Sequence, residues 1–302
     1  MDFIHTVSLN SCYMRKQNIE KYKNALIARG GVISDEKDSD SVYIWTCAFR
    51  RDALENSVKK IRAVRAAYQE KKIYICGCMP SIAPEETKHL AEEVNAEIIP
   101  WKNEGKYFPD EALKSCDCVY AEPPFCEDVE KYKRENPGKP IAFPDSFVKV
   151  SISEGCTCNC AYCSEKWAFP PYKSFPKEDI VSRCRDLVRE SGNYRIMLLA
   201  DSPGEYGIDK GYDITMLMEE LYALDARISI ALNNFHPFFF LKYFDYFMGK
   251  ICQGKISHVN LPIQSGCSSV LKKMNRRYGK ADLEKIFSAF IDKIFINLIH
   301  TS

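Results

Sequence analysis

The stretch "FVKVSISEGCTCNCAYC", residues 147–163, places four cysteines directly after an apolar segment. Residues 147–153 have the composition of a β-strand, and the cysteines follow at its end. Three of them, Cys156, Cys160 and Cys163, are spaced C-x₃-C-x₂-C, and Cys158 lies between them. In parallel α/β proteins, functional groups gather at the C-terminal ends of strands. The stretch therefore predicts an α/β fold with a site in the loop after this strand.

Three thiolates in one tight loop could each ligate one iron of a four-iron cluster. No fourth cysteine follows at ferredoxin spacing, so one iron would stay open to a small molecule, as a catalytic cluster requires. Two other interpretations remain open. A zinc site normally has paired C-x₂-C spacing, which only Cys160 and Cys163 show here. The cysteines could also be unrelated buried thiols.

Composition limits the class of protein. The 302 residues are 46% hydrophobic and 27% charged, and a chain of this length can form about two domains. The formal net charge of +1 gives no overall basic field that would indicate nucleic acid, and it excludes none. No signal peptide or membrane span is recognisable, which predicts a cytoplasmic protein. Thiols stay reduced there, so the fourteen cysteines indicate metal or redox chemistry rather than disulfides.

Short strands alternate with helices in both halves of the sequence, which predicts parallel sheets with helical crossovers. In the first half the predicted strands are residues 3–10, 41–46, 71–76 and 96–100. The predicted helices run from about residue 18 to Gly30, around residues 54–68, and over 84–96.

Residues 121–146 are rich in proline and charge, which predicts a linker between two domains. After it, strands are predicted over residues 147–153, 194–201, 227–234, 255–263 and 294–300. Helices are predicted near residues 177–191, 213–226, 238–249 and 268–292, the last broken near Gly279. This alternation favours a (βα) barrel or part of one.

The spacing C-x₃-C-x₂-C, with the aromatic Tyr162 before the last cysteine, resembles the signature of the radical S-adenosylmethionine (SAM) superfamily. More narrowly, the whole chain resembles the methylthiotransferases. The matching segments, in order, are "LNSCY", "WTCAFRRDA", "CGCMP", "GCTCNCAYC", "SFPKEDIVSRCRDLV", "LLADSPGEYGID" and "NLPIQSGCSSVLKKMNRRYG". They are spread along nearly the whole chain, from residue 9 to residue 279.

The resemblance implies an N-terminal methylthiotransferase domain over residues 1–120, a linker over 121–146, and a radical SAM core over 147–302. It implies two [4Fe-4S] clusters. The radical SAM cluster would be held by Cys156, Cys160 and Cys163, and an auxiliary cluster by Cys12, Cys47 and Cys78. Each of these last three follows a predicted strand, so they could meet at one edge of a parallel sheet. The alternative is that they are separate core thiols, a role for which Cys76 is the better candidate.

The resemblance also implies contacts with SAM and an activity. Asp201 and Ser202 would meet the methionine part, Gln264 and Ser265 the nucleoside, and Tyr162 the adenine. Reduction by a donor such as flavodoxin or ferredoxin would cleave SAM to a 5′-deoxyadenosyl radical. The radical would remove hydrogen from an unreactive C–H that then receives a methylthio group.

Family substrates are adenosine 37 of tRNA or an aspartate of a small-subunit ribosomal protein, and "PIQSG" favours tRNA. A radical SAM enzyme acting on a ribosomal protein or peptide is the second interpretation. A third, from another class, is a two-cluster electron-transfer protein, which would not cleave SAM.

The last predicted strand ends close to the end of the sequence, "IFINLIHTS". A parallel strand needs its crossover helix as cover. The radical SAM core is therefore expected to be incomplete at its C-terminus, either because the chain is a shortened form or because a partner covers the edge. Relatives continue into a small β-barrel that binds RNA, so this chain is expected to bind tRNA weakly.

Overall fold

The computed structural model describes residues 2–9, 13–100, 147–168 and 170–290 of the chain. The chain forms two compact units. Unit 1 comprises Met1–Cys118 and Cys163–Pro170, and unit 2 comprises Val119–Tyr162 and Pro171–Ser302. The predicted linker and the predicted strand over residues 294–300 lie outside the described residues.

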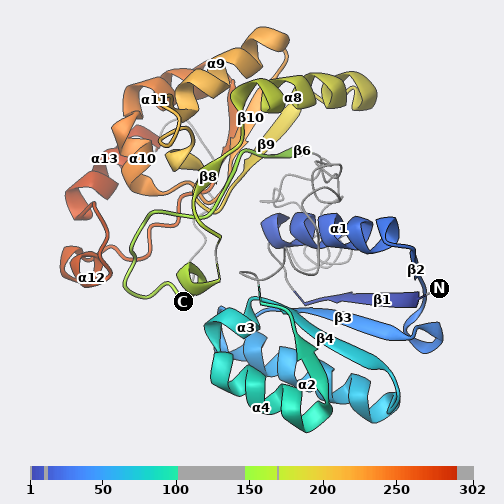
Figure 1. The fold of residues 1–302 in the computed structure, drawn as a ribbon. Helices are drawn as coiled ribbons and strands as arrows, with labels where there is room; N and C mark the ends of the chain where they lie inside the picture. The colour runs from blue at the N-terminus through green and yellow to red at the C-terminus, as the bar shows by residue number, and fades with distance from the viewer. Residues whose placement is uncertain (1, 10–12, 101–146, 169, 291–302) are drawn as a thin grey trace, which may run out of the picture. The chain divides into compact units, whose positions relative to one another are not determined.

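Unit 1 is built on a five-stranded sheet in which every neighbouring pair of strands is parallel, in the order β2-β1-β3-β4-β5. The strands are β1 (Asp2–Ser8), β2 (Gly31–Ile33), β3 (Ser41–Thr46), β4 (Lys72–Gly77) and β5 (Ala96–Ile98). The helices are α1 (Tyr13–Ala28), α2 (Arg51–Ala67), α3 (Met79–Ile82) and α4 (Pro84–Val94), and a 3₁₀ turn η1 spans Glu36–Asp38. Figure 1 shows α1 on one face of this sheet and α2 and α4 on the other.

Strand β3 is buried along its whole length because helices cover both faces of the sheet. Tyr43 and Trp45 pack in the cluster on the α1 side, where Trp45 stacks on Tyr22 with ring centroids 6.2 Å apart. Val42 and Ile44 point the other way and pack with residues of α2 and α4. Successive side chains of a strand alternate between faces, so a strand covered on both sides is a continuous apolar run.

Unit 2 contains a four-stranded parallel sheet in the order β11-β10-β9-β6. Its strands are β6 (Val148–Ser151), β9 (Arg195–Leu199), β10 (Ser229–Leu232) and β11 (Ile256–Val259). Strands β7 (Ser153–Glu154) and β8 (Lys173–Ser174) form a small antiparallel pair. The helices are α8 (Lys177–Ser191), α9 (Ile214–Leu224), α10 (Pro237–Lys242), α11 (Phe244–Cys252), α12 (Ser268–Lys273) and α13 (Lys280–Phe290). The 3₁₀ turn η4 (Pro203–Glu205) follows β9, whereas the 3₁₀ turn η3 (Glu165–Trp167) belongs to unit 1.

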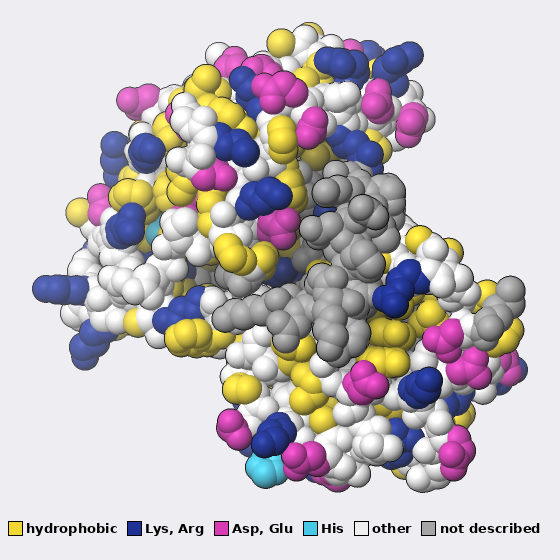
Figure 2. All heavy atoms as spheres, viewed as in Figure 1, with side chains coloured by type: hydrophobic (Ala, Val, Ile, Leu, Met, Phe, Trp, Pro, Cys, Tyr) yellow, Lys and Arg dark blue, Asp and Glu magenta, His cyan; other side chains and the backbone are white. Residues whose placement is uncertain are grey.

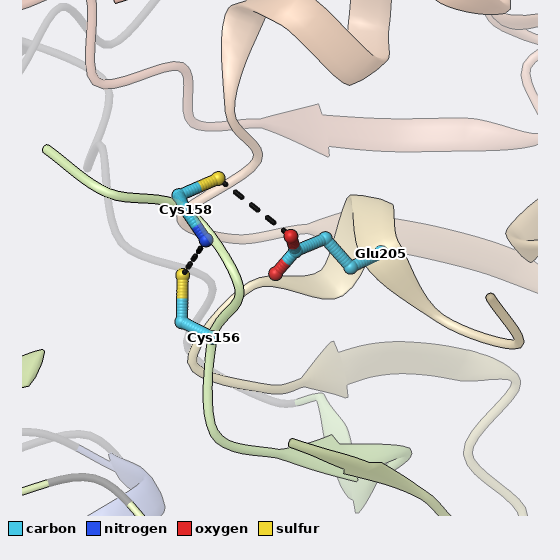
Figure 3. A group of neighbouring side chains, drawn as sticks. All are labelled: Cys156, Cys158 and Glu205. Atoms are coloured by element: carbon cyan, nitrogen blue, oxygen red, sulfur yellow. Dashed lines mark hydrogen bonds between the residues drawn. The ribbon is translucent and has the colours of Figure 1, made fainter. Parts of the chain in front are cut away.

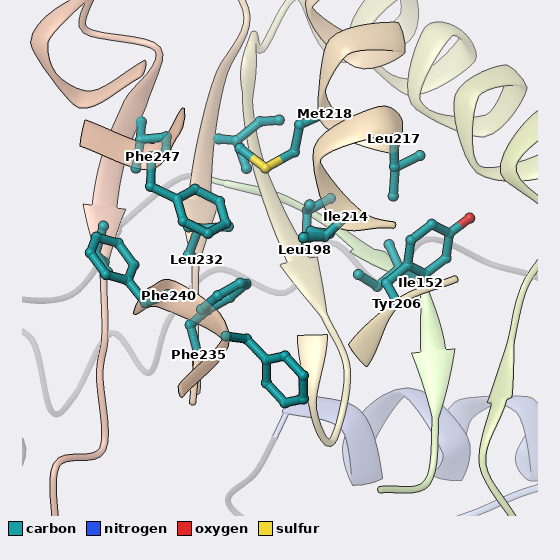
Figure 4. Packing of buried hydrophobic residues seen from close by; sticks show 14 of the residues in the cluster. Ile152, Leu198, Tyr206, Ile214, Leu217, Met218, Leu232, Phe235, Phe240 and Phe247 are labelled. Carbon is teal, nitrogen blue, oxygen red and sulfur yellow. The ribbon is translucent and has the colours of Figure 1, made fainter. Parts of the chain in front are cut away.

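The core of unit 2 lies between its sheet and these helices, and aromatic rings fill much of it (Figure 4). Phe247 of α11 is fully buried. It stacks on Phe240 with centroids 5.2 Å apart and meets Phe235 edge-on at 5.1 Å. Both arrangements are favourable for aromatic pairs, so α10, α11 and the end of β10 are held together through this ring.

The predicted fold class is confirmed: an α/β chain with an N-terminal parallel sheet and a second, partial βα sheet. Some details differ. The helix predicted over residues 238–249 is two helices divided at Tyr243, whose backbone leaves helical geometry at φ −116° and ψ 32°. Helix α1 starts at Tyr13, earlier than predicted, and the short strands β2, β7 and β8 were not predicted.

The described side chains on the face seen in Figure 2 form no large area of one charge. On the face seen in Figure 2, lysine and arginine side chains are interspersed with aspartate and glutamate. This agrees with the near-zero net charge of the sequence. Among the described residues, no helix combines the length and the apolar character that crossing a membrane requires.

We expect Phe247→Ala to lower the free energy of unfolding of unit 2 by about 3–5 kcal/mol, because it leaves a cavity among buried rings. Phe247→Leu is the matched control and should cost less, because it keeps most of the apolar volume. Hydrogen exchange of β9 and β10 peptides at increasing urea measures the free energy of unfolding of unit 2 in both variants. Equal losses in the two variants would contradict this role of the ring.

Candidate functional site

The cysteine loop, residues 155–162, leaves the carboxyl edge of the unit 2 sheet after β6 and β7. Gly155 starts it with φ +77°, a conformation that glycine adopts at low cost. The Gly155 N–H donates to Asp201 Oδ2 at 2.9 Å. Asp201 follows β9, the strand that pairs with β6, so the start of the loop is fixed to the neighbouring strand's end.

The thiols of the loop lie in a setting suited to soft metal ligands. Cys160 is buried and Cys156 is half-buried, and Cys163 is the next residue along the chain after the loop. The N–H of Cys158 donates to Cys156 Sγ at 3.4 Å, the kind of backbone bond that stabilises a metal-bound sulfur. Three cysteines in one short segment, with an amide directed at one sulfur, fit an iron–sulfur cluster. Since each would bind a different iron, their sulfurs need not touch.

Hydrogen bonding to the side chain of Cys158, then burial, then the nearby charge of Glu205 raise the pKa of the Cys156 thiol. Without metal the loop therefore holds this thiol in its protonated form. A metal binds the thiolate, so loading would release this proton.

Glu205 is the functional-site residue that sequence reasoning missed. Its side chain is 1% exposed, and it comes from η4 after β9. Its carboxylate accepts the N–H of Thr157 at 3.1 Å, the hydroxyl of Thr157, and the thiol of Cys158 at 3.7 Å. Among the described residues, Cys156, Cys158 and Glu205 are the group of potential metal ligands whose atoms all lie within 4.8 Å of one another (Figure 3). The signal available in sequence was an acid in the loop "ADSPGEYG" directly after a predicted strand.

The far end of the cysteine loop is held by the segment after α12. The side-chain amide of Asn275 donates to Asn159 O at 2.6 Å, and the N–H of Ala161 donates to the carbonyl of Met274 at 3.0 Å. Arg276 donates to the hydroxyl of Tyr162, and its guanidinium lies 5.4 Å from the Tyr162 ring centroid. In the basic run "KKMNRRYGK", Asn275 and Arg276 therefore support the loop.

Four of the predicted SAM-contacting residues lie in loops beyond the carboxyl ends of β9 and β11, and the fifth, Tyr162, lies in the cysteine loop. Ser202 is buried beside Asp201. Gln264 has φ +64°, and Ser265 Oγ accepts the N–H of Cys267 at 3.1 Å. Tyr162 is 46% exposed. Their contacts with SAM stay predictions.

In unit 1, Cys47 and Cys78 stand at the same edge of the sheet. Strands β3 and β4 pair in register as far as Thr46 and Gly77, and each cysteine is the next residue. The Cys78 N–H donates to Thr46 O at 3.0 Å, which ties the two turns together. Cys12, the third predicted ligand, lies outside the described residues. The backbone thus brings the two described cysteines to one edge of the sheet, and their binding of a shared cluster stays a prediction.

The thiols of unit 1 differ in how deeply they lie. Burial raises the pKa of Cys47, whose N–H donates to Ser57 Oγ at 3.1 Å. Burial also raises the pKa of Cys76, which is 1% exposed and packs in the core cluster on the α1 side. Cys76 is thus placed as a core thiol, as the sequence indicated.

Comparison with known families decides the class of this chain. Residues 5–98 match the model described as "Uncharacterized protein family UPF0004". Residues 150–301, half of the chain, match the model of the "Radical SAM superfamily". The chain belongs to the radical SAM superfamily. The two models match successive parts of the chain, and relatives that match along nearly all of it are named as methylthiotransferases.

Its relatives carry two kinds of name. A "Probable threonylcarbamoyladenosine tRNA methylthiotransferase" of Methanothermobacter thermautotrophicus is 24% identical over 292 residues, which cover 94% of this chain and 65% of that protein. The "Ribosomal protein uS12 methylthiotransferase RimO" of Desulfotalea psychrophila is 27% identical over 312 residues, covering 96% and 64%. The chain thus spans just under two thirds of the length of these radical SAM relatives.

A solved structure shares the fold. The radical S-adenosylmethionine methyltransferase TsrM from Kitasatospora setae, solved with cobalamin and a [4Fe-4S] cluster bound, aligns with a TM-score of 0.55. The alignment covers 97% of this chain and 67% of that one, at 11% identity. At that identity the likeness concerns the fold alone.

We expect Gly77→Ala to disturb the edge that carries Cys47 and Cys78. Gly77 has φ +87°, and an added Cβ would lie 2.6 Å from Thr46 O. Gly30→Ala is the matched control, because Gly30 has φ +89° with nothing within 4 Å. The control should cost about 1–2 kcal/mol of stability from backbone strain alone. Gly77→Ala should cost more, measured by urea denaturation followed by tryptophan fluorescence, and equal costs would argue against the close packing of the two turns.

Proposed function

We propose that this protein is a radical SAM methylthiotransferase that inserts a methylthio group at an unactivated C–H, most directly of a modified adenosine in tRNA. The observation that carries the proposal is the cysteine loop at the carboxyl edge of the unit 2 sheet. Three thiols of one short segment, an amide directed at Cys156 Sγ, and loops from neighbouring strands around them are what a catalytic cluster needs.

Each residue of the loop has a distinct part in this proposal. Cys156, Cys160 and Cys163 would hold a [4Fe-4S] cluster with one iron open to SAM. When bound, the cluster supplies the electron that cleaves SAM, and the protein positions the two. Asp201, through the Gly155 amide, fixes where the loop starts, and Asn275 fixes its far end. Ser202, Gln264 and Ser265 are the proposed SAM contacts.

The second cluster is part of the same proposal. Cys12, Cys47 and Cys78 would hold it, and it would carry the sulfur that is delivered. Its support is the common edge at which Cys47 and Cys78 stand, joined by the bond from the Cys78 amide to Thr46 O. An electron donor such as flavodoxin or ferredoxin would supply the reducing equivalents, and the cytoplasm, where thiols stay reduced, is the proposed compartment.

Transfer RNA is the substrate that we propose, because the segment "PIQSG" resembles the tRNA-acting branch of the family and a relative named for a tRNA nucleoside matches 94% of the chain. The second candidate is an aspartate of a small-subunit ribosomal protein. It is favoured by the relative named for uS12, which matches 96%.

We expect the two cysteine sets to fail differently. Cys160→Ala should abolish formation of 5′-deoxyadenosine from SAM, because the radical cluster loses a ligand. Cys47→Ala should still cleave SAM yet transfer no methylthio group. Product analysis after anaerobic reconstitution measures both, with circular dichroism to show that the variants are folded. If folded Cys47→Ala lost SAM cleavage as well, this division of roles would be wrong.

The substrate is tested by mass spectrometry in cells with and without the gene. A methylthio-adenosine present in tRNA only when the gene is present is the expected result. An unchanged set of nucleosides together with a methylthio group on a ribosomal protein would favour the second candidate. SAM that stays intact under reducing conditions, with clusters loaded, would instead indicate an electron-transfer protein.

A further inference from the structure

Glu205 is a buried carboxylate whose hydrogen bonds come from the cysteine loop. Its side chain is 1% exposed. One oxygen accepts the Thr157 N–H at 3.1 Å, and the other accepts the Thr157 hydroxyl and the Cys158 thiol, the latter at 3.7 Å. Hydrogen bonds to an ionised acceptor inside a protein are about twice as strong as neutral ones. The turn after β9 therefore fixes the part of the loop that lies between the first two cysteines of the signature.

Cys158 is engaged at both of its polar groups. Its N–H donates to Cys156 Sγ at 3.4 Å, while its thiol points to Glu205 Oε1 (Figure 3). The bond to the carboxylate sets the direction of the Cys158 thiol, and the bond to Cys156 sets that of its backbone amide. The same residue thus supports the sulfur of Cys156 through its backbone, while its side chain is bound to Glu205.

We propose that Glu205 is a positioning residue that selects the cluster ligands. By holding Thr157 and Cys158, it leaves Cys156, Cys160 and Cys163 as the three that bind iron. This inference rests on the proposed function and deepens it. The spacing of four cysteines in eight positions does not by itself show which three bind iron. The buried negative charge also lies close to the cluster position, where it favours the oxidised cluster and lowers its reduction potential.

An alternative is a single metal ion held by Cys156, Cys158 and Glu205, because their ligand atoms lie within 4.8 Å of one another. The hydrogen bonds argue against that occupant. Both carboxylate oxygens already accept bonds from Thr157, which leaves fewer lone pairs for a metal. Zinc bound at this group is therefore an outcome that the test must be able to detect.

The test uses the full chain carrying Cys47→Ala and Cys78→Ala. These changes remove ligands of the proposed second cluster, so the iron content measures binding by the cysteine loop. This parent should load about four irons per chain on anaerobic reconstitution, and SAM should change the electron paramagnetic resonance spectrum of the reduced cluster. Glu205→Ala, Glu205→Gln and Cys158→Ala are made in it. Asp209→Asn is the matched control: Asp209 lies four residues further on and accepts the Ser174 N–H instead, at 3.0 Å.

Cys158→Ala and Asp209→Asn should bind as much iron as the parent does. Glu205→Ala should bind several-fold less iron. Glu205→Gln keeps an acceptor for Thr157, so it should load iron like the parent, yet with its midpoint potential shifted to more positive values because the charge is gone. Melting of the metal-free proteins shows whether a variant is folded. If Glu205→Ala does not fold, the iron content of Cys158→Ala and the midpoint potential of Glu205→Gln still test the inference.

Several results would overturn the inference. Iron lost in Cys158→Ala would make Cys158 a ligand, and full iron in Glu205→Ala would remove the positioning role. An unchanged potential in Glu205→Gln would show that the carboxylate does not act on the cluster. About one zinc per chain, lost in both Glu205→Ala and Cys158→Ala, would mark a mononuclear site. A parent that loads no iron, or whose spectrum ignores SAM, would instead contradict the proposed function itself.

Discussion

Parallel pairing of strands is the constraint on which both units depend. In unit 1 the pairs Trp45↔Cys76 and Thr46↔Gly77 stand level, so the residues that follow them leave the sheet at one edge. In unit 2, β6 and β9 pair up to Ser151 and Leu199 in the same way. Within each unit, the sheet therefore brings a cysteine-bearing segment and its supporting loops to one edge of that sheet, although these segments lie tens of residues apart in sequence.

The sequence was sufficient to predict the elements whose burial pattern is strong. Strand β3 was predicted with its observed bounds because residues 41–46 are apolar or small along the whole run, as a strand covered on both faces must be. Helix α8 has the predicted bounds as well. Strands of two or three residues, such as β2 and β7, are too short to show any period. The break at Tyr243 depends on the packing of the surrounding aromatic rings, which an apolar run of residues cannot reveal.

The residues of the candidate site also differ in whether the sequence could predict them. The cysteines could be predicted because their function depends on spacing within one loop or on the ends of successive strands. Glu205 and Asn275 could not, because each acts through contacts made far along the chain. Asn275 is 116 residues from Asn159, whose carbonyl accepts its amide. In sequence it lies in the basic run "KKMNRRYGK", which gives no sign of this contact.

The bonds from Asn275 and Arg276 to the cysteine loop can form only after both segments have been synthesised. The loop is synthesised more than a hundred residues before the segment that holds its far end. On the ribosome, the cysteines therefore emerge without part of the framework that fixes their positions. Iron can meet a fully supported loop only after the chain has been made beyond residue 276. A cluster inserted into the fully supported loop would thus follow synthesis of this segment rather than accompany it.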